Sequence, residues 1–178
     1  MAGRDRRRFF LRLAVSCAGS LFSARAGATN VDLGASAGGF LAGSVPRFSI
    51  SPYITISMPA FGDSFSVGVN EMASLLLAAG NRGPGFYNHL TAFGALTWKD
   101  GKLVLGPTLA LFAMPACGPT WCGNLRGFGA GGSVRIDLFE KPLGASLGCN
   151  VDVPIKSTAL LPSGPAVMFF AGGVFRVL

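Results

Sequence analysis

The sequence predicts an all-β protein: an eight-stranded antiparallel up-and-down transmembrane β-barrel that follows an N-terminal signal peptide. Three observations lead to this prediction. Apolar residues alternate with other residues in eight segments, the intervening positions hold small and mostly uncharged side chains, and tight turns alternate with longer loops. The 178 residues are 50% hydrophobic and 13% charged, against about 25% charged in a usual soluble domain. The mean hydropathy of +0.50 does not come from a helix, because Gly, Pro, Ser and Asn interrupt every stretch of the roughly 20 residues that a membrane helix needs.

The first 26 residues are predicted to be a secretory signal peptide. A basic stretch precedes an apolar run, Leu13 to Phe22, and a small-residue site, Ala24-Arg25-Ala26, so cleavage is expected before Gly27. Six of the 15 basic and one of the 8 acidic residues lie there, which leaves 15 − 6 = 9 basic and 8 − 1 = 7 acidic residues in the predicted barrel domain, residues 27–178. The charge of +7 therefore falls to +2 and gives no reason to expect nucleic-acid binding.

Two sharper interpretations of the same segment remain open beside an ordinary basic export signal. Arg6-Arg7-Arg8 is similar to a twin-arginine motif, and Ala14 to Cys17 is similar to a weak lipidation site. We favour the ordinary signal, because Ala14 stands where a lipidation site usually has Leu and the apolar run continues past Cys17.

The first three strands are expected at Val31 to Leu41, at Phe48 to Met58 and from Phe65 onward. Val31 and Leu33 share one face of the first while Asp32 and Gly34 share the other, which is the period of two that a strand requires. The third is ambiguous between Asn70 and Gly80, where helix formers follow an N-cap. We favour a strand in which a bulge turns Glu71 inward over a short helix.

The other five strands follow the same rule. The fifth has four leucines in phase, and the sixth and seventh alternate aliphatic residues with Gly, Ser and charged residues. Their expected ranges are Asn88 to Lys99, Lys102 to Met114, Phe128 to Leu138, Leu143 to Val153 and Val167 to Leu178.

The connections between these segments alternate in length. Tight turns are expected at Phe61-Gly62, Asp100-Gly101 and Glu140-Lys141, and Asp-Gly is a strong hairpin signal. With those dipeptides as loops, Met58 would face Phe65, Trp98 would face Leu103, and Leu138 would face Leu143, so the apolar faces would be continuous. Longer connections rich in Gly and Pro are expected around residues 41–47, 78–87, 115–124 and 154–165.

The second face of each strand indicates which side meets water. A soluble sandwich or lipocalin-like barrel would carry Lys and Glu there, whereas this face holds mainly Gly, Ser, Thr and Ala. Small side chains suit the interior of a narrow barrel, and bulky aliphatic ones suit lipid. A membrane barrel is therefore favoured over a soluble β protein, which stays open as an alternative.

By this pattern the chain resembles the small eight-stranded outer-membrane β-barrels of Gram-negative bacteria, the OmpA-like and OmpX-like group. The resemblance implies a place in the cell outer membrane, contact with outer-membrane lipids, and the barrel-assembly machinery as a partner during biogenesis. It implies a structural or surface-interaction role rather than an enzymatic one, and we expect a monomer without a cofactor. The final Leu178 departs from the aromatic residue with which such barrels usually end.

Four charged residues are expected inside the barrel near the short turns: Asp32, Arg135, Asp137 and Arg176. They sum to zero, and Asp32 would lie beside Arg176 where the first and last strands meet. We favour a salt-bridged structural plug. A gate that passes ions through a small pore is the alternative.

The remaining candidates concern His89 and the cysteines. Asn88-His89-Leu90-Thr91 faintly resembles the His-x-Ser of barrel lipid A deacylases, but Thr91 replaces Ser, so we expect His89 to be a polar interior residue and assign no catalytic or metal-binding residue. Cys117 and Cys122 are expected to form a disulfide after export, and Cys149 is expected on the apolar face.

Aromatic residues are expected to form two belts at the membrane interfaces. The expected members are Phe61, Phe65, Trp98, Phe139 and Phe175 near the short turns, and Phe86, Tyr87, Trp121 and Phe169 near the longer loops.

Overall fold

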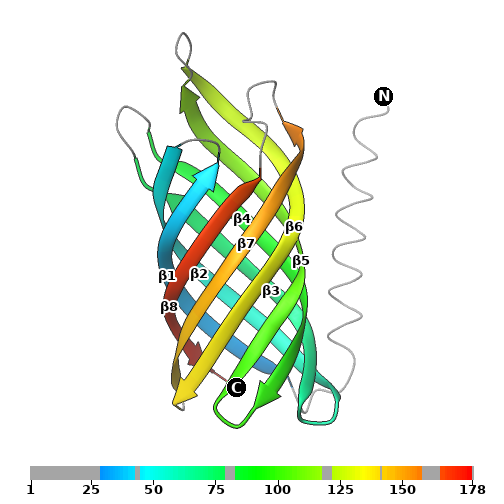
Figure 1. The fold of residues 1–178 in the computed structure, drawn as a ribbon. Coiled ribbons are helices and arrows are strands. Elements are labelled where there is room, and N and C mark those ends of the chain that lie inside the picture. The colour runs from blue at the N-terminus through cyan, green and yellow to red at the C-terminus, as the bar shows by residue number, and fades with distance from the viewer. Residues whose placement is uncertain are drawn as a thin grey trace.

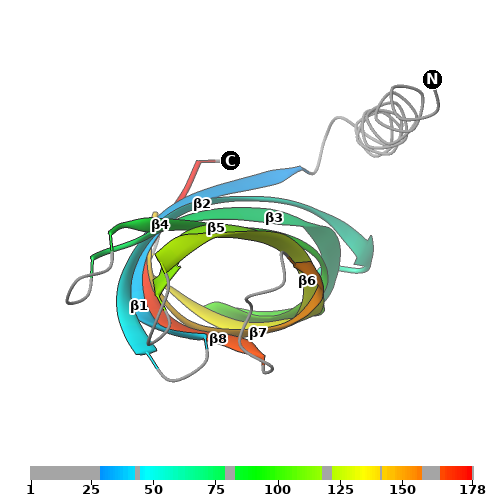
Figure 2. The same ribbon diagram turned by 90° about the horizontal axis from the view of Figure 1, so that it is seen from above.

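Eight antiparallel strands close into a single barrel in this computed structural model (Figure 1). Each strand pairs with its neighbours in sequence, and β8 closes the barrel against β1, as the view along the axis shows (Figure 2). The structure describes residues 29–42, 45–78, 83–117, 122–140, 142–157 and 165–177. The strands are β1 (Asn30–Ala42), β2 (Val45–Phe61), β3 (Phe65–Leu76), β4 (Gly85–Trp98), β5 (Gly101–Cys117), β6 (Cys122–Glu140), β7 (Leu143–Ser157) and β8 (Ala166–Arg176).

The predicted fold, a closed eight-stranded antiparallel up-and-down barrel, is confirmed. Every segment with alternating apolar residues forms a strand, because the period of two places one set of side chains on each side of the sheet. The predicted signal peptide, residues 1–26, lies outside the described residues. Within those described, no helix is long and apolar enough to cross a membrane.

The three tight turns lie together at the end of the barrel where the C-terminus is found (Figure 1). Their predicted registers were wrong by two residues. Met58 pairs with Val67, Trp98 with Gly101, and Leu138 with Ala145. A shift of two leaves each side chain on its face, so the apolar surface is continuous all the same.

The connections at the opposite end are shorter than predicted, because the strands extend into them. Pairing of β1 with β2 continues to Ala42 and Val45, which leaves only residues 43 and 44 between the strands. On β5 and β6 it reaches Cys117 and Cys122.

β3 is a regular strand through the stretch that could have been a helix. Its pairing with β2 keeps one register from Val67 to Leu76, and the only irregularity lies between Pro59 and Phe61. The predicted bulge that would turn Glu71 inward is therefore wrong. The Glu71 side chain is exposed on the outer face, where Asn88 Nδ2 donates to its Oε1 at 3.3 Å.

The interior of the barrel holds the buried polar and charged side chains together with a cluster of apolar ones, whereas the outer face is mainly apolar. Leu109, Leu147 and Ile155 on the outer face are each more than 60% exposed, whereas Asp32, Asp137 and His89 are fully buried in the interior. This is the inverse of a soluble protein, in which large aliphatic side chains are mostly buried and charged ones exposed. The soluble β-sandwich and lipocalin-like alternatives are not supported by this distribution.

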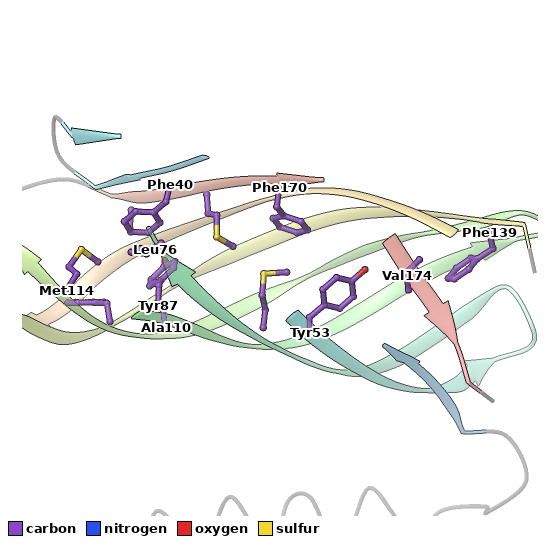
Figure 3. Packing of buried hydrophobic residues seen from close by; sticks show 13 residues of the cluster. Phe40, Tyr53, Leu76, Tyr87, Ala110, Met114, Phe139, Phe170 and Val174 are labelled. Atoms are coloured by element: carbon purple, nitrogen blue, oxygen red, sulfur yellow. The ribbon is translucent and has the colours of Figure 1, made fainter. Parts of the chain in front are cut away.

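Large apolar side chains point into the barrel interior and pack against one another (Figure 3). Tyr53 and Phe170 point inward opposite glycines on adjacent strands. A Cβ atom at Gly34 would lie 2.1 Å from the Tyr53 ring, and one at Gly148 would lie 2.4 Å from the Phe170 ring. Glycine is therefore required where the rings lie over the neighbouring backbone, which explains part of the glycine content.

Candidate functional site

The predicted charge cluster forms inside the barrel near the short turns. Strand alternation aims Asp32 on β1, Arg135 and Asp137 on β6, and Arg176 on β8 into the interior. Asp32 and Arg176 are direct partners across the closing seam, and Arg176 Nε lies 3.2 Å from Asp32 Oδ1. Arg135 Nε lies 3.0 Å from Asp137 Oδ1. The four predicted residues thus all point into the interior and form two ion pairs there.

Lys102 is a fifth member that sequence reasoning missed. Its Nζ contacts Asp32 Oδ2 and lies 3.6 Å from Asp137 Oδ2, and the residue is 3% exposed. Three cations now face two carboxylates, so the formal charge of the cluster is 3 − 2 = +1 rather than the predicted zero. Lys102 shares its inward phase with Val104 and Thr108, and that phase could have revealed it.

Arg135 lies at the centre of this network. Its guanidinium donates to Asn70 Oδ1 at 2.7 Å and to Thr55 Oγ1 at 3.0 Å, and it lies 4.9 Å from the centre of the Tyr53 ring. Buried charges need this degree of pairing and hydrogen bonding to be tolerated. The arrangement crosses the interior from β2 and β3 to β6, and it supports a structural plug over an open gate.

A second polar cluster, nearer the opposite end, surrounds Asp152 on β7. Tyr87 Oη donates to Asp152 Oδ2 at 2.5 Å, and the Thr108 hydroxyl donates to Asp152 Oδ1. His89 Nδ1 lies 3.1 Å from Asp152 Oδ2, within ion-pair distance but not aligned for a hydrogen bond. The rings of Tyr87 and His89 meet edge to face with centres 4.0 Å apart.

This geometry confirms that His89 is a polar interior residue. Its side chain is fully buried, and Thr91 two residues on is 2% exposed on the same inner face. A lipid molecule outside the barrel cannot reach either group, so the structure does not support a lipid-modifying site at His89. In the described part of the chain, no group of three or more His, Cys, Asp or Glu side chains could hold a metal ion.

The cysteines and aromatic residues divide between confirmed and corrected predictions. Cys117 and Cys122 are backbone partners across β5 and β6, which is compatible with a disulfide, and the bond itself stays a prediction. Cys149 is a partly exposed free thiol on the outer face.

Phe139 and Tyr87 point inward and are buried, so their predicted places in the interfacial belts are wrong. Trp121 lies outside the described residues, whereas the predicted belt members with exposed outer side chains are Phe61, Trp98, Phe175, Phe86 and Phe169.

Comparison with solved structures finds the same fold in small bacterial barrels. Neisserial surface protein A superposes with a TM-score of 0.56 at 13% identity, and the N-terminal β-barrel domain of OprF from Pseudomonas aeruginosa superposes with 0.57 at 11%. Ail, the attachment invasion locus protein of Yersinia pestis, solved in complex with the heparin analogue sucrose octasulfate, gives 0.50 at 7%. Each alignment covers 83% of this chain and 96% or 97% of the other.

No protein-family model and no curated protein sequence matches the chain. At these identities the likeness to solved structures shows the fold alone.

Proposed function

We propose that this chain is an integral β-barrel protein of the outer membrane with a structural or surface-interaction role. The observation that carries the proposal is the inverted distribution of side chains, with aliphatic residues outside and charged residues inside. Only a solvent that is itself apolar makes that arrangement favourable.

The outer surface carries exposed aliphatic side chains in continuous rows, which is unfavourable in water. Leu105, Leu109 and Leu111 follow one another along β5 and are 49%, 61% and 61% exposed. On β7, the outward residues Leu147, Val151, Val153 and Ile155 repeat this pattern. Exposed apolar area costs about 25 cal/mol per Å² in water, and patches of several hundred Å² on soluble monomers are uncommon.

Exposed aromatic residues near both ends of the barrel support the proposal that the barrel spans a membrane. Trp98 and Phe175 are 46% and 44% exposed near the short turns, while Phe86 and Phe169 are 44% and 62% exposed toward the opposite end. Such rings favour the boundary between lipid and water. By the same layout, the short turns would face the periplasm and the opposite connections the cell exterior.

The filled interior favours a structural role over transport. Arg135 and its partners connect β2, β3 and β6, and the Tyr87, His89 and Asp152 cluster connects β4 with β7. Eight strands leave an interior just wide enough for side chains. Recognition, where it occurs, would then depend on the exterior connections.

The proposal is tested by locating the protein in a Gram-negative host. We expect it in the outer-membrane fraction, extractable only with detergent, and with a gel mobility that changes on boiling because the folded barrel resists the detergent used for electrophoresis. The monomeric state is measured in the same detergent by light scattering. Recovery in the soluble fraction without detergent would refute the proposal.

A further inference from the structure

A pocket opens at the short-turn end of the barrel, next to the charge cluster. Lys102 and Arg176 line it together with the neutral polar side chains of Ser57, Ser66 and Thr97, and Asp63 of the β2–β3 turn also lines it. The pocket therefore combines two cationic groups with three hydroxyl groups at one site.

Three cations face two carboxylates in this cluster, and two of the cations, Lys102 and Arg176, line the pocket. Asp137 is shared by Arg135 and Lys102, and Asp32 is shared by Lys102 and Arg176. Arg135 gains further partners in Asn70 and Thr55. Within the described part of the chain, the Arg176 guanidinium donates a hydrogen bond through Nε alone, to Asp32.

Arg176 is also the accessible member of the cluster. Its side chain is 30% exposed, against 4% for Lys102 and 2% for Arg135. Its guanidinium carbon lies 4.0 Å from the centre of the Phe139 ring, which holds the group in place on one face. A guanidinium fixed by an aromatic ring and a carboxylate retains terminal N–H donors for a second acceptor.

We propose that this pocket binds a small anionic group, a carboxylate or a phosphate, through Arg176. A planar guanidinium matches either anion with two parallel hydrogen bonds, and such charge-assisted bonds are among the strongest in proteins. Lys102 adds positive potential from the inner wall, and the hydroxyl groups of Ser57, Ser66 and Thr97 supply neutral donors. An anion would offset the +1 charge of the five-residue cluster, and the Asp63 carboxylate, which also lines the pocket, would oppose it. If the protein has the orientation proposed above, the pocket faces the periplasm.

Asp63 gives the proposal an internal check. It lines the same pocket, is exposed, and makes no ion pair within 4.0 Å in the described residues. Its negative charge opposes an incoming anion, so Asp63→Asn should tighten binding while leaving the charge cluster intact.

The test measures anion binding to the folded protein in uncharged detergent micelles. Inorganic phosphate, acetate and N-acetylglycine are titrated separately by calorimetry, and saturable binding is expected for phosphate, for the carboxylates, or for both. Binding of phosphate alone identifies a phosphate site, and binding of the carboxylates alone identifies a carboxylate site. If none of the three anions binds saturably at concentrations up to about 50 mM, the proposal is overturned, because a site with a dissociation constant above that value would have no selective affinity.

The variants locate the site. Arg176→Gln should weaken binding by at least about tenfold, Asp63→Asn should strengthen it by about threefold, and Thr97→Val should weaken it by a few fold. Glu71→Gln removes the same charge as Asp63→Asn but lies on the outer face, so it should leave the affinity unchanged. If Arg176→Gln fails to fold, the affinities of Asp63→Asn and Thr97→Val test whether the anion binds in this pocket. Unchanged affinity in the folded pocket variants would overturn the assignment of the anion site. This outcome is independent of whether the protein is found in the outer-membrane fraction, which tests the proposed function.

Discussion

Replacement of Asp32 by Asn tests whether the interior charge cluster stabilises the barrel. Asp32 is fully buried, its Oδ2 contacts Lys102 Nζ, and its Oδ1 lies 3.2 Å from Arg176 Nε. The change raises the formal charge of the cluster from +1 to +2. Loss of one partner of a buried ion pair costs about 3–5 kcal/mol. Lys102 keeps Asp137 as a partner at 3.6 Å, and Arg176 is partly exposed, so we expect a loss at the lower end of this range. The free energy of unfolding should fall by about 3 kcal/mol, which is roughly 150-fold in the unfolding equilibrium.

Glu71→Gln is the matched control, because it removes the same negative charge from the opposite face of the sheet. Glu71 points outward and accepts a hydrogen bond from Asn88, which a glutamine carbonyl can also accept. A carboxylate that faces lipid is unfavourable, so its neutralisation should leave stability unchanged or raise it.

The free energies of unfolding are measured by urea titration of each variant in phospholipid vesicles, followed by tryptophan fluorescence and by gel mobility without boiling. The expected result is a large loss for Asp32→Asn and none for Glu71→Gln. Equal losses in the two variants, or a larger loss for Glu71→Gln, would refute the assignment of the two faces.

Three further predictions concern packing, the disulfide and the second polar cluster. A Cβ at Gly34 would clash with the Tyr53 ring and one at Gly39 would meet nothing within 4 Å, so Gly34→Ala should cost about 1–3 kcal/mol and Gly39→Ala should be tolerated, as urea titration will show. Cys117 and Cys122 should resist alkylation until the protein is reduced, so that Cys149 alone reacts beforehand, and free thiols at both Cys117 and Cys122 in freshly exported protein would disprove the bond. Reduction should then cost about 2 kcal/mol, because the bond closes a short loop. Asp152→Asn should cost about 2–4 kcal/mol, since it weakens charge-assisted bonds from two hydroxyl groups, and unchanged thermal stability would contradict this.

The fold was predictable because it depends on a local rule. Alternation identifies each strand from its own residues, and up-and-down topology needs only neighbouring strands to pair. Register was less accessible, because the choice between Trp98 facing Leu103 and Trp98 facing Gly101 depends on the geometry of the turn. Both registers preserve the faces, so the hydrophobic pattern cannot distinguish them.

The site was predictable only where its members are neighbours in the sheet. Asp32 and Arg176 meet across the seam between β1 and β8, which the closed topology dictates. Lys102 and Asp32 come from β5 and β1, and His89 and Asp152 come from β4 and β7. Contacts across the interior depend on strand tilt and stagger, and these are properties of the closed barrel rather than of any one segment.

Contact between the outer face and lipid is tested most directly by placing a single tryptophan at Leu109 on β5 or at Leu147 on β7, with Trp98 and Trp121 replaced by Phe. Both positions are more than 60% exposed, and their strands are separated by β6. In vesicles, phospholipids brominated in their acyl chains should quench the fluorescence at both positions strongly, while aqueous acrylamide should quench it weakly. Strong quenching by acrylamide without an effect of the brominated lipids would contradict the account.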